Sequence, residues 1–109
     1  FGALSGFDER FFMYVEDMEL CFRAKKMGFP IYFYSDVSIR HRALGSSNRT
    51  FAILHIYKGL LYFYKKHMSF IEYTLARLLL FVKACIAIAI GMLTHNTYLT
   101  STYRKALAL

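Results

Sequence analysis

The most constraining feature of this sequence is an apolar stretch from Phe70 to Leu93, interrupted by only three charged side chains. As an α-helix this stretch would be about 36 Å long, which is enough to cross a bilayer. Glu72, Arg77 and Lys83 would each be costly at the centre of a membrane. Glu72 and Lys83 nearly coincide on a helical wheel, with Arg77 on a flank. A helix lying in the membrane interface is therefore favoured over a spanning one.

Charge is unevenly distributed along the chain. The net charge is +7 over 109 residues, a length that suits one small domain. Residues 1–36 hold six of the seven acidic residues, whereas residues 37–109 hold one acidic and ten basic residues. This asymmetry indicates an anionic partner for the second half: nucleic acid, an anionic membrane or a phosphorylated substrate. An aromatic content of 18% excludes a disordered chain, and two cysteines give no disulfide framework.

The hydrophobic periodicity predicts three helices, at residues 16–27, 50–67 and 70–93. Gly28 is expected to end the first helix in a left-handed conformation, with Phe29 as its apolar partner. The polar tail, residues 94–109, is expected to fray.

Between the first two helices the pattern predicts β-structure and a loop. Residues 31–34 are rich in strand-forming side chains, and residues 37–41 form a second extended segment. A turn at Ser35 and Asp36 separates the two short strands. Residues 43–49 have the composition of a loop. The pattern therefore predicts a mainly helical chain with two short strands, followed by the apolar helix.

The adjacent carboxylates Glu16 and Asp17, with Glu19 close behind, are the sharpest chemical feature. One interpretation is structural, because acidic residues in the first turn of a helix complement its dipole. The other is catalytic, because a carboxylate at a helix start beside apolar walls can accept a proton from a hydroxyl. Crowding by the second carboxylate would raise one of the two pKa values and assist that task.

A second candidate site lies around the predicted loop. His41 ends a predicted strand, a position where binding residues gather, and imidazole is a common metal ligand. Backbone amides and arginines around the loop could hold a diphosphate, although an ordinary solvated loop has the same composition. The residues concerned are Arg40, Arg42, Gly45, Ser46, Ser47 and Arg49.

Lysines and tyrosines alternate in the helix predicted at residues 50–67. Such a mixture is typical of a single-stranded nucleic-acid surface or of a membrane-interface belt. The adjoining apolar stretch favours the membrane interpretation, with no nucleic acid bound. The residues expected to dock an anionic membrane are Lys65, Lys66, Arg77 and Lys83.

The run SGFDERFFMYVEDMEL from Ser5 to Leu20 resembles the C-terminal part of a family 2 glycosyltransferase of the rhamnosyltransferase-like branch. The similarity extends over about residues 2–67 and keeps its order and spacing. Its further matches are Arg23, Lys26, Gly28, Phe29, Tyr32, Tyr34, His41, the Gly45-Ser46-Ser47 run and the stretch YFYKKH from Tyr62 to His67.

This resemblance implies a GT-A fold, a Rossmann-like α/β sandwich, with residues 1–49 as the acceptor side of the catalytic domain. Residues 50–109 would be a helical, membrane-associating extension. Asp17 would be the catalytic base and Glu16 would position the acceptor. In some members the histidine at the place of His41 joins two aspartates in binding Mg²⁺ or Mn²⁺, which stabilises the leaving diphosphate.

The resemblance also implies the partners: a nucleotide-diphosphate sugar donor and a glycan or polyprenyl-linked acceptor at the cytoplasmic face of a bacterial inner membrane. The family's nucleotide-binding half has no counterpart here, so the chain is expected to be the C-terminal part of a longer protein and inactive alone. The alternative is a non-enzymatic, basic membrane-associated interaction module. Nucleic-acid binding explains only the charge.

Overall fold

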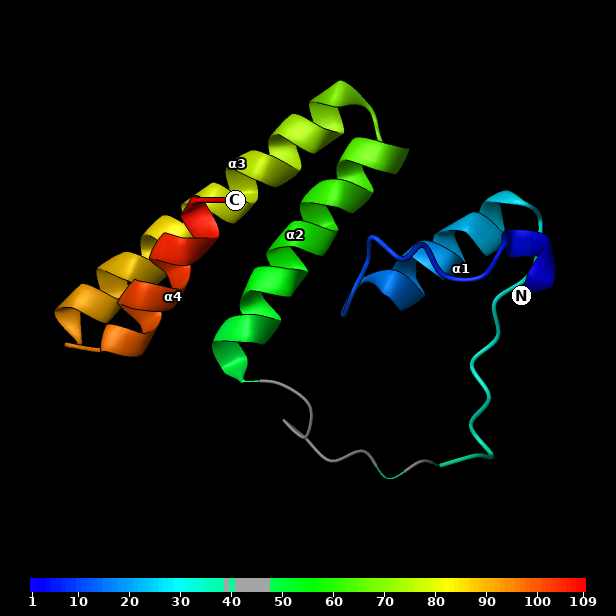
Figure 1. Cartoon of the computed structure of the whole chain (residues 1–109), viewed down its shortest axis with the longest axis horizontal. Helices are drawn as coiled ribbons and strands as arrows, with labels where there is room; N and C mark the ends of the chain where they lie inside the picture. Colours follow the sequence, from blue (N-terminus) through cyan, green and yellow to red (C-terminus); the bar gives the residue numbers. More distant parts are fainter. Residues whose placement is uncertain (39, 41–47) are drawn as a thin grey trace.

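The computed structural model describes residues 1–38, 40 and 48–109, and within these it contains helices and no strand. A short 3₁₀ helix, η1, precedes four α-helices (Figure 1). Their bounds are Gly2–Leu4 for η1, Glu16–Lys26 for α1, Arg49–His67 for α2, Phe70–Leu93 for α3 and Thr97–Leu107 for α4.

The expectation of an α/β fold is therefore wrong for the described chain. Residues 31–34 and the described residues of 37–41 are neither strand nor helix, although the turn at Ser35 and Asp36 is present. Every described residue from 31 to 40 is exposed, including Phe33 at 95%. A strand forms only where a neighbour takes up its backbone hydrogen bonds, and no described segment pairs with this one. Strand-forming side chains alone do not supply that neighbour.

Helix α1 ends where the sequence predicted. Gly28 has a φ of 84°, and the N–H groups of Gly28 and Phe29 donate to the carbonyls of Lys25 and Ala24, both at 3.0 Å. This pair of bonds is a Schellman motif, which caps the last carbonyls of the helix.

Helices α2, α3 and α4 pack together, and α1 lies on the opposite side of α2 (Figure 1). Their shared core is built around Tyr57 of α2, Ala84 of α3 and Ala106 of α4. The Tyr57 hydroxyl donates to the Leu80 carbonyl at 3.2 Å. Burial raises the pKa of Tyr57 to about 12, because the phenolate would lose its hydration.

The polar tail is a packed helix, which corrects the expectation that it frays. Asn96 caps α4 by accepting from the Leu99 N–H at 3.1 Å. Thr102 is fully buried and shares a hydrogen bond of 2.8 Å with Thr50 of α2. Gly91 of α3 lets α4 approach closely, since an added Cβ would lie 2.7 Å from Thr100 Oγ1. The polar segment thus packs as a helix because Gly91 lets it approach α3 closely.

Helix α3 coincides with the apolar stretch of the sequence. Ser69 and Glu72 form a capping box at its start, with the Ser69 N–H donating to Glu72 Oε2 at 2.8 Å. By length and composition α3 could cross a membrane, with a mean hydropathy of 2.1. Its outer side is exposed and apolar over the whole length. The large side chains there include Ile71, Leu75, Leu78, Leu79, Val82, Ile86 and Leu93.

Candidate functional site

The Glu16-Asp17 pair begins α1 directly after a strained turn. Tyr14 and Val15 both have positive φ, at 64° and 69°. This backbone region is costly for residues with a β-carbon and especially for β-branched valine. Val15 is nevertheless the N-cap of α1, and its carbonyl accepts from the Glu19 N–H at 2.9 Å. The turn therefore fixes the orientation of the backbone that carries Glu16 and Asp17.

The two carboxylates of the pair differ in their surroundings. Asp17 is exposed, and its Oδ1 accepts from the Met18 N–H at 2.8 Å. Glu16 is half-buried, and its Oε2 is shielded from solvent without a hydrogen-bond partner among the described residues. A buried carboxylate oxygen that accepts no hydrogen bond is costly, because it has lost its hydration without a replacement.

Helix α2 supports the strained turn through Gly59. Gly59 is buried, and a β-carbon there would lie 2.9 Å from Val15 Cγ2 and 3.5 Å from the Tyr14 carbonyl oxygen. Only glycine leaves room for this approach. The position of the acidic pair thus depends on a residue more than forty positions away in the sequence.

Glu19 has a structural role that its sequence neighbours do not share. Its side chain is fully buried and lies between α1 and the end of α2. Arg23 Nε contacts both carboxylate oxygens at 2.8 and 2.9 Å, Lys66 Nζ lies 2.7 Å from Oε1, and His67 Nε2 lies 2.9 Å from Oε1. Burial opposes ionisation, but the hydrogen bonds from Lys66, His67 and Arg23 outweigh it and hold the pKa of Glu19 below its ordinary value.

Asp8 extends this cluster toward the N-terminus. Its Oδ2 accepts from Lys66 at 2.8 Å and from the Tyr62 hydroxyl at 3.2 Å. The bond from Lys66 is the main reason that the pKa of Asp8 falls to about 2. Arg23 also donates to the carbonyls of Leu4 and Gly6, the second at 2.7 Å. We call this set the carboxylate clamp; its members are Asp8, Glu19, Arg23, Lys66 and His67.

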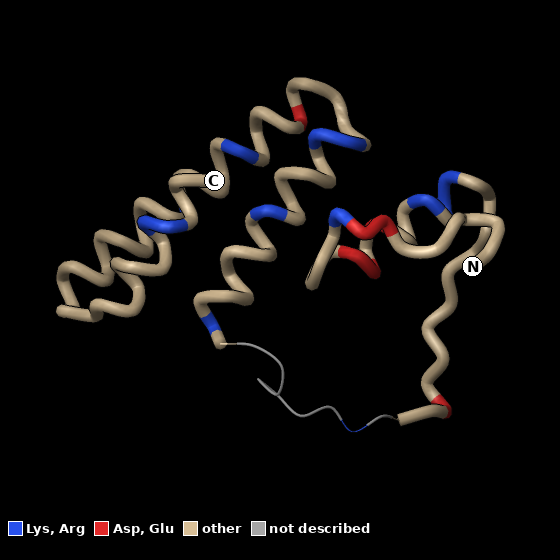
Figure 2. The backbone as a smooth tube through the Cα atoms, in the orientation of Figure 1, with Lys and Arg blue, Asp and Glu red and all other residues tan. Residues whose placement is uncertain are grey.

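The four cations expected at a membrane do not share one environment. Lys66 belongs to the carboxylate clamp, and its pKa is raised because the bonds to Asp8 and Glu19 outweigh the cost of its burial. Lys83 Nζ lies 5.8 Å from the centre of the Tyr57 ring. Lys65 and Arg77 lie on facing parts of α2 and α3 and have no ion pair within the described chain. Figure 2 shows most of the acidic residues on the α1 side of α2 and one at the start of α3, whereas basic residues lie on all four α-helices.

Most of the loop site lies outside the described residues. This holds for His41, Arg42, Ser46 and Ser47. Arg49 is exposed at the start of α2. Within residues 1–38, 40 and 48–109, no three His, Cys, Asp or Glu side chains gather as metal ligands. The Mg²⁺ or Mn²⁺ centre that the resemblance implies would use His41, which lies outside these residues, so it stays a prediction and we derive no chemical step through a metal.

No family model, curated protein or solved structure matches this chain. A function for the chain therefore has to be argued from the geometry of its described residues and from the sequence resemblance.

Three residues that position the acidic pair were missed in the sequence. The sequence pattern indicates Glu19 only as a neighbour of the pair, although its spacing to Arg23 is the four residues of a helical ion pair. The sequence pattern predicts Lys66 at a membrane surface and gives no role to Gly59 inside its helix. A glycine in a helix interior costs about 1 kcal/mol relative to alanine, so it signals a close packing contact.

Proposed function

We propose that this chain is the acceptor-side part of a membrane-associated inverting glycosyltransferase, in which Asp17 accepts the proton of the acceptor hydroxyl. One observation carries the proposal: a strained turn at Tyr14 and Val15 presents the acidic pair, while the third carboxylate, Glu19, is occupied by the carboxylate clamp. Strained backbone persists where the surrounding structure over-determines it, and it concentrates at functional sites.

The two carboxylates of the pair suit different roles. Asp17 is open to solvent, so a hydroxyl can approach it and transfer its proton to the carboxylate. Glu16 precedes Asp17 directly in the chain, so its carboxylate would orient the same acceptor. In the proposed reaction the acceptor oxygen bonds to the anomeric carbon, the bond from that carbon to the diphosphate breaks, and the nucleoside diphosphate leaves with the bonding electrons. The resemblance to family 2 glycosyltransferases supplies this reaction class.

The test is the Asp17→Asn variant of the complete enzyme. The amide keeps the shape of the side chain but cannot accept the proton, so turnover should fall at least ~10²-fold while donor binding is retained. Glu9→Gln is the matched control, because Glu9 is an exposed acid in the same segment and should keep normal turnover. Near-normal turnover of Asp17→Asn would remove Asp17 from the reaction.

A second candidate function, a non-enzymatic membrane module, is favoured by α3. The exposed apolar side of this helix would sit on lipid, with each buried CH₂ group contributing about 0.8 kcal/mol. Liposome flotation tests this part of the proposal. The Leu75→Glu/Val82→Glu variant should lose flotation, whereas Ile31→Glu/Val37→Glu, with the same charge change at exposed apolar positions outside α3, should keep it. Flotation together with no glycosyl transfer by the complete protein would favour the module.

A further inference from the structure

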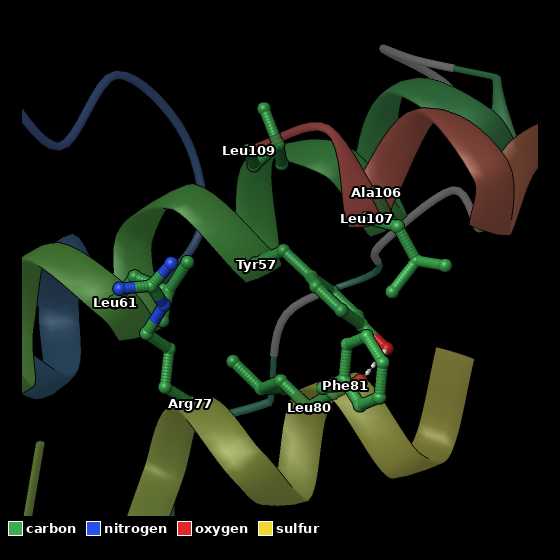
Figure 3. A pocket seen from close by; sticks show the side chains of 8 residues that line it. All are labelled: Tyr57, Leu61, Arg77, Leu80, Phe81, Ala106, Leu107 and Leu109. Carbon is green, nitrogen blue, oxygen red and sulfur yellow. Dashed lines mark hydrogen bonds between the residues drawn. The ribbon is translucent and has the colours of Figure 1, made fainter. Parts of the chain in front are cut away.

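A groove runs between α2 and α3 and is closed at one end by the C-terminal residues of the chain. It consists of neighbouring hollows that share lining residues. Leu61 and Leu109 line one hollow with Arg77 and another, of about 280 Å³, with Lys58 and Lys65. Arg77 also lines a third hollow, of about 440 Å³, that opens on the exposed apolar side of α3. In Figure 3 the Arg77 side chain extends from α3 toward Leu61 of α2. We call these connected hollows the α2–α3 groove.

The groove is basic, and its cations are available. Lys58, Lys65 and Arg77 line it, and no acidic side chain does. None of the three makes an ion pair within the described part of the chain, in contrast to Lys66, which lies beside Lys65 in sequence and is held by two carboxylates. Lys58 and Lys65 line one hollow, and Arg77 lines the two hollows that share residues with it. Lysine and arginine cations match a phosphate group in charge and in hydrogen-bonding capacity.

The walls of the groove are apolar and continue onto the lipid-facing side of α3. Phe70, Leu78 and Phe81 line its open end, and all three are among the exposed apolar side chains of this helix. A hydrocarbon chain attached to a phosphate at the three cations would therefore lie against apolar side chains. A free phosphate ion would leave that surface in contact with water.

We propose that the α2–α3 groove binds the phosphate headgroup of an anionic bilayer lipid at Lys58, Lys65 and Arg77, with the lipid chain along Phe70, Leu78 and Phe81. This inference rests on the membrane attachment in the proposed function and adds a specific lipid site to it. Membrane attachment then has two components: the apolar side of α3 provides insertion into any bilayer, and the groove provides the preference for anionic lipid.

The experiment compares two triple variants of the full chain that lose the same charge. Lys58→Gln/Lys65→Gln/Arg77→Gln removes the cations of the groove. Lys25→Gln/Lys26→Gln/Lys105→Gln removes three exposed lysines outside it. Flotation uses phosphatidylcholine vesicles that contain graded amounts of phosphatidylglycerol. The increase in vesicle binding caused by phosphatidylglycerol should be at least ~10-fold smaller for the groove variant than for the wild type. For the control variant this increase should be no more than about 3-fold smaller than for the wild type, because separated surface charges are screened by salt.

Native mass spectrometry from neutral detergent measures the site directly. The wild type and the control variant should retain one phosphatidylglycerol molecule, and the groove variant none. The conservative variant Lys58→Arg/Lys65→Arg should retain it. Equal lipid loss in both triple variants would overturn the groove as a specific site, as would full displacement of the lipid by inorganic phosphate. Absence of wild-type flotation on any vesicle would instead overturn the membrane attachment itself.

Discussion

Helix α2 contacts its neighbours on two sides, and the interactions on the two sides differ. On one side the carboxylate clamp joins α2 to α1 and to the N-terminal segment, with Glu19 fully buried among Arg23, Lys66 and His67. On the other side α3 and α4 pack through small side chains and one hydroxyl pair, with Ala84 and Thr102 fully buried. The first contact contains a buried ion cluster in addition to the close packing at Gly59, and the second depends mainly on volume.

This difference decides which changes each side tolerates. A buried ion cluster is weakened strongly when one partner is removed, because the remaining charges lose their compensation. A close-packed apolar contact is indifferent to charge and pH but sensitive to one added methyl group. The candidate acidic pair lies on the charge-dependent side, and the candidate lipid groove lies on the volume-dependent side. The two proposed activities can therefore be disturbed separately.

Removing Glu19 should have the largest effect. Glu19→Ala leaves Arg23, Lys66 and His67 without their shared carboxylate and should reduce the free energy of α1 docking by about 3–5 kcal/mol. Hydrogen exchange should accelerate in α1, with little change in α3 and α4. Glu9→Ala is the control, because Glu9 is exposed. Equal protection of α1 in both variants would show that the carboxylate clamp does not hold this helix.

Low pH should weaken the docking of α1 on α2 by less than Glu19→Ala does. A protonated carboxyl keeps its volume and can still form hydrogen bonds. The pKa of Asp8 falls from an ordinary value of 3.8 to about 2, and the pKa of Glu19 is also lowered. A lowered carboxyl pKa stabilises the folded state above the ordinary pKa, and this stabilisation is lost as the pH falls toward the folded value. Exchange of α1 amides should therefore accelerate between about pH 4 and pH 2. Simultaneous loss of α1, α3 and α4 over this range would contradict the separation of the two sides.

These two sides also explain what could be predicted from the sequence. The bounds of α2 and α3 follow within one residue from hydrophobic periodicity, which is a local signal. The end of α1 followed from Gly28 for the same reason. The strand predicted at residues 31–34 is wrong, as is the one at 37–41 where the structure describes it, because a strand depends on a partner elsewhere. The packing of α4 was missed because it depends on Gly91, and the role of Glu19 was missed because it depends on Lys66.

The two interior glycines allow a matched comparison of the sides. A β-carbon at Gly59 would lie 2.9 Å from Val15 Cγ2, and one at Gly91 would lie 2.7 Å from Thr100 Oγ1. Overpacking of this kind costs about 1–3 kcal/mol, reduced by the better helix propensity of alanine. Gly59→Ala should accelerate hydrogen exchange around residues 14–19, and Gly91→Ala should do so in α4. Gly2→Ala is the control, since nothing lies within 4 Å of an added Cβ there. Faster exchange only in α4 for Gly59→Ala, or only around residues 14–19 for Gly91→Ala, would contradict the contacts assigned to these glycines.

The smallest effect is expected at the hydroxyl pair between α2 and α4. Thr50 and Thr102 share one hydrogen bond of 2.8 Å, and Thr102 is fully buried. Thr102→Val keeps the shape of the side chain but leaves the Thr50 hydroxyl without this bond, so the free energy of unfolding should fall by about 1 kcal/mol. The double variant Thr50→Val/Thr102→Val removes both hydroxyls and should recover most of that loss, because no polar group remains unsatisfied. Denaturant unfolding of the wild type, both single variants and the double variant completes the cycle. Additive losses would mean that the two hydroxyls act independently and that α4 is held by apolar packing alone.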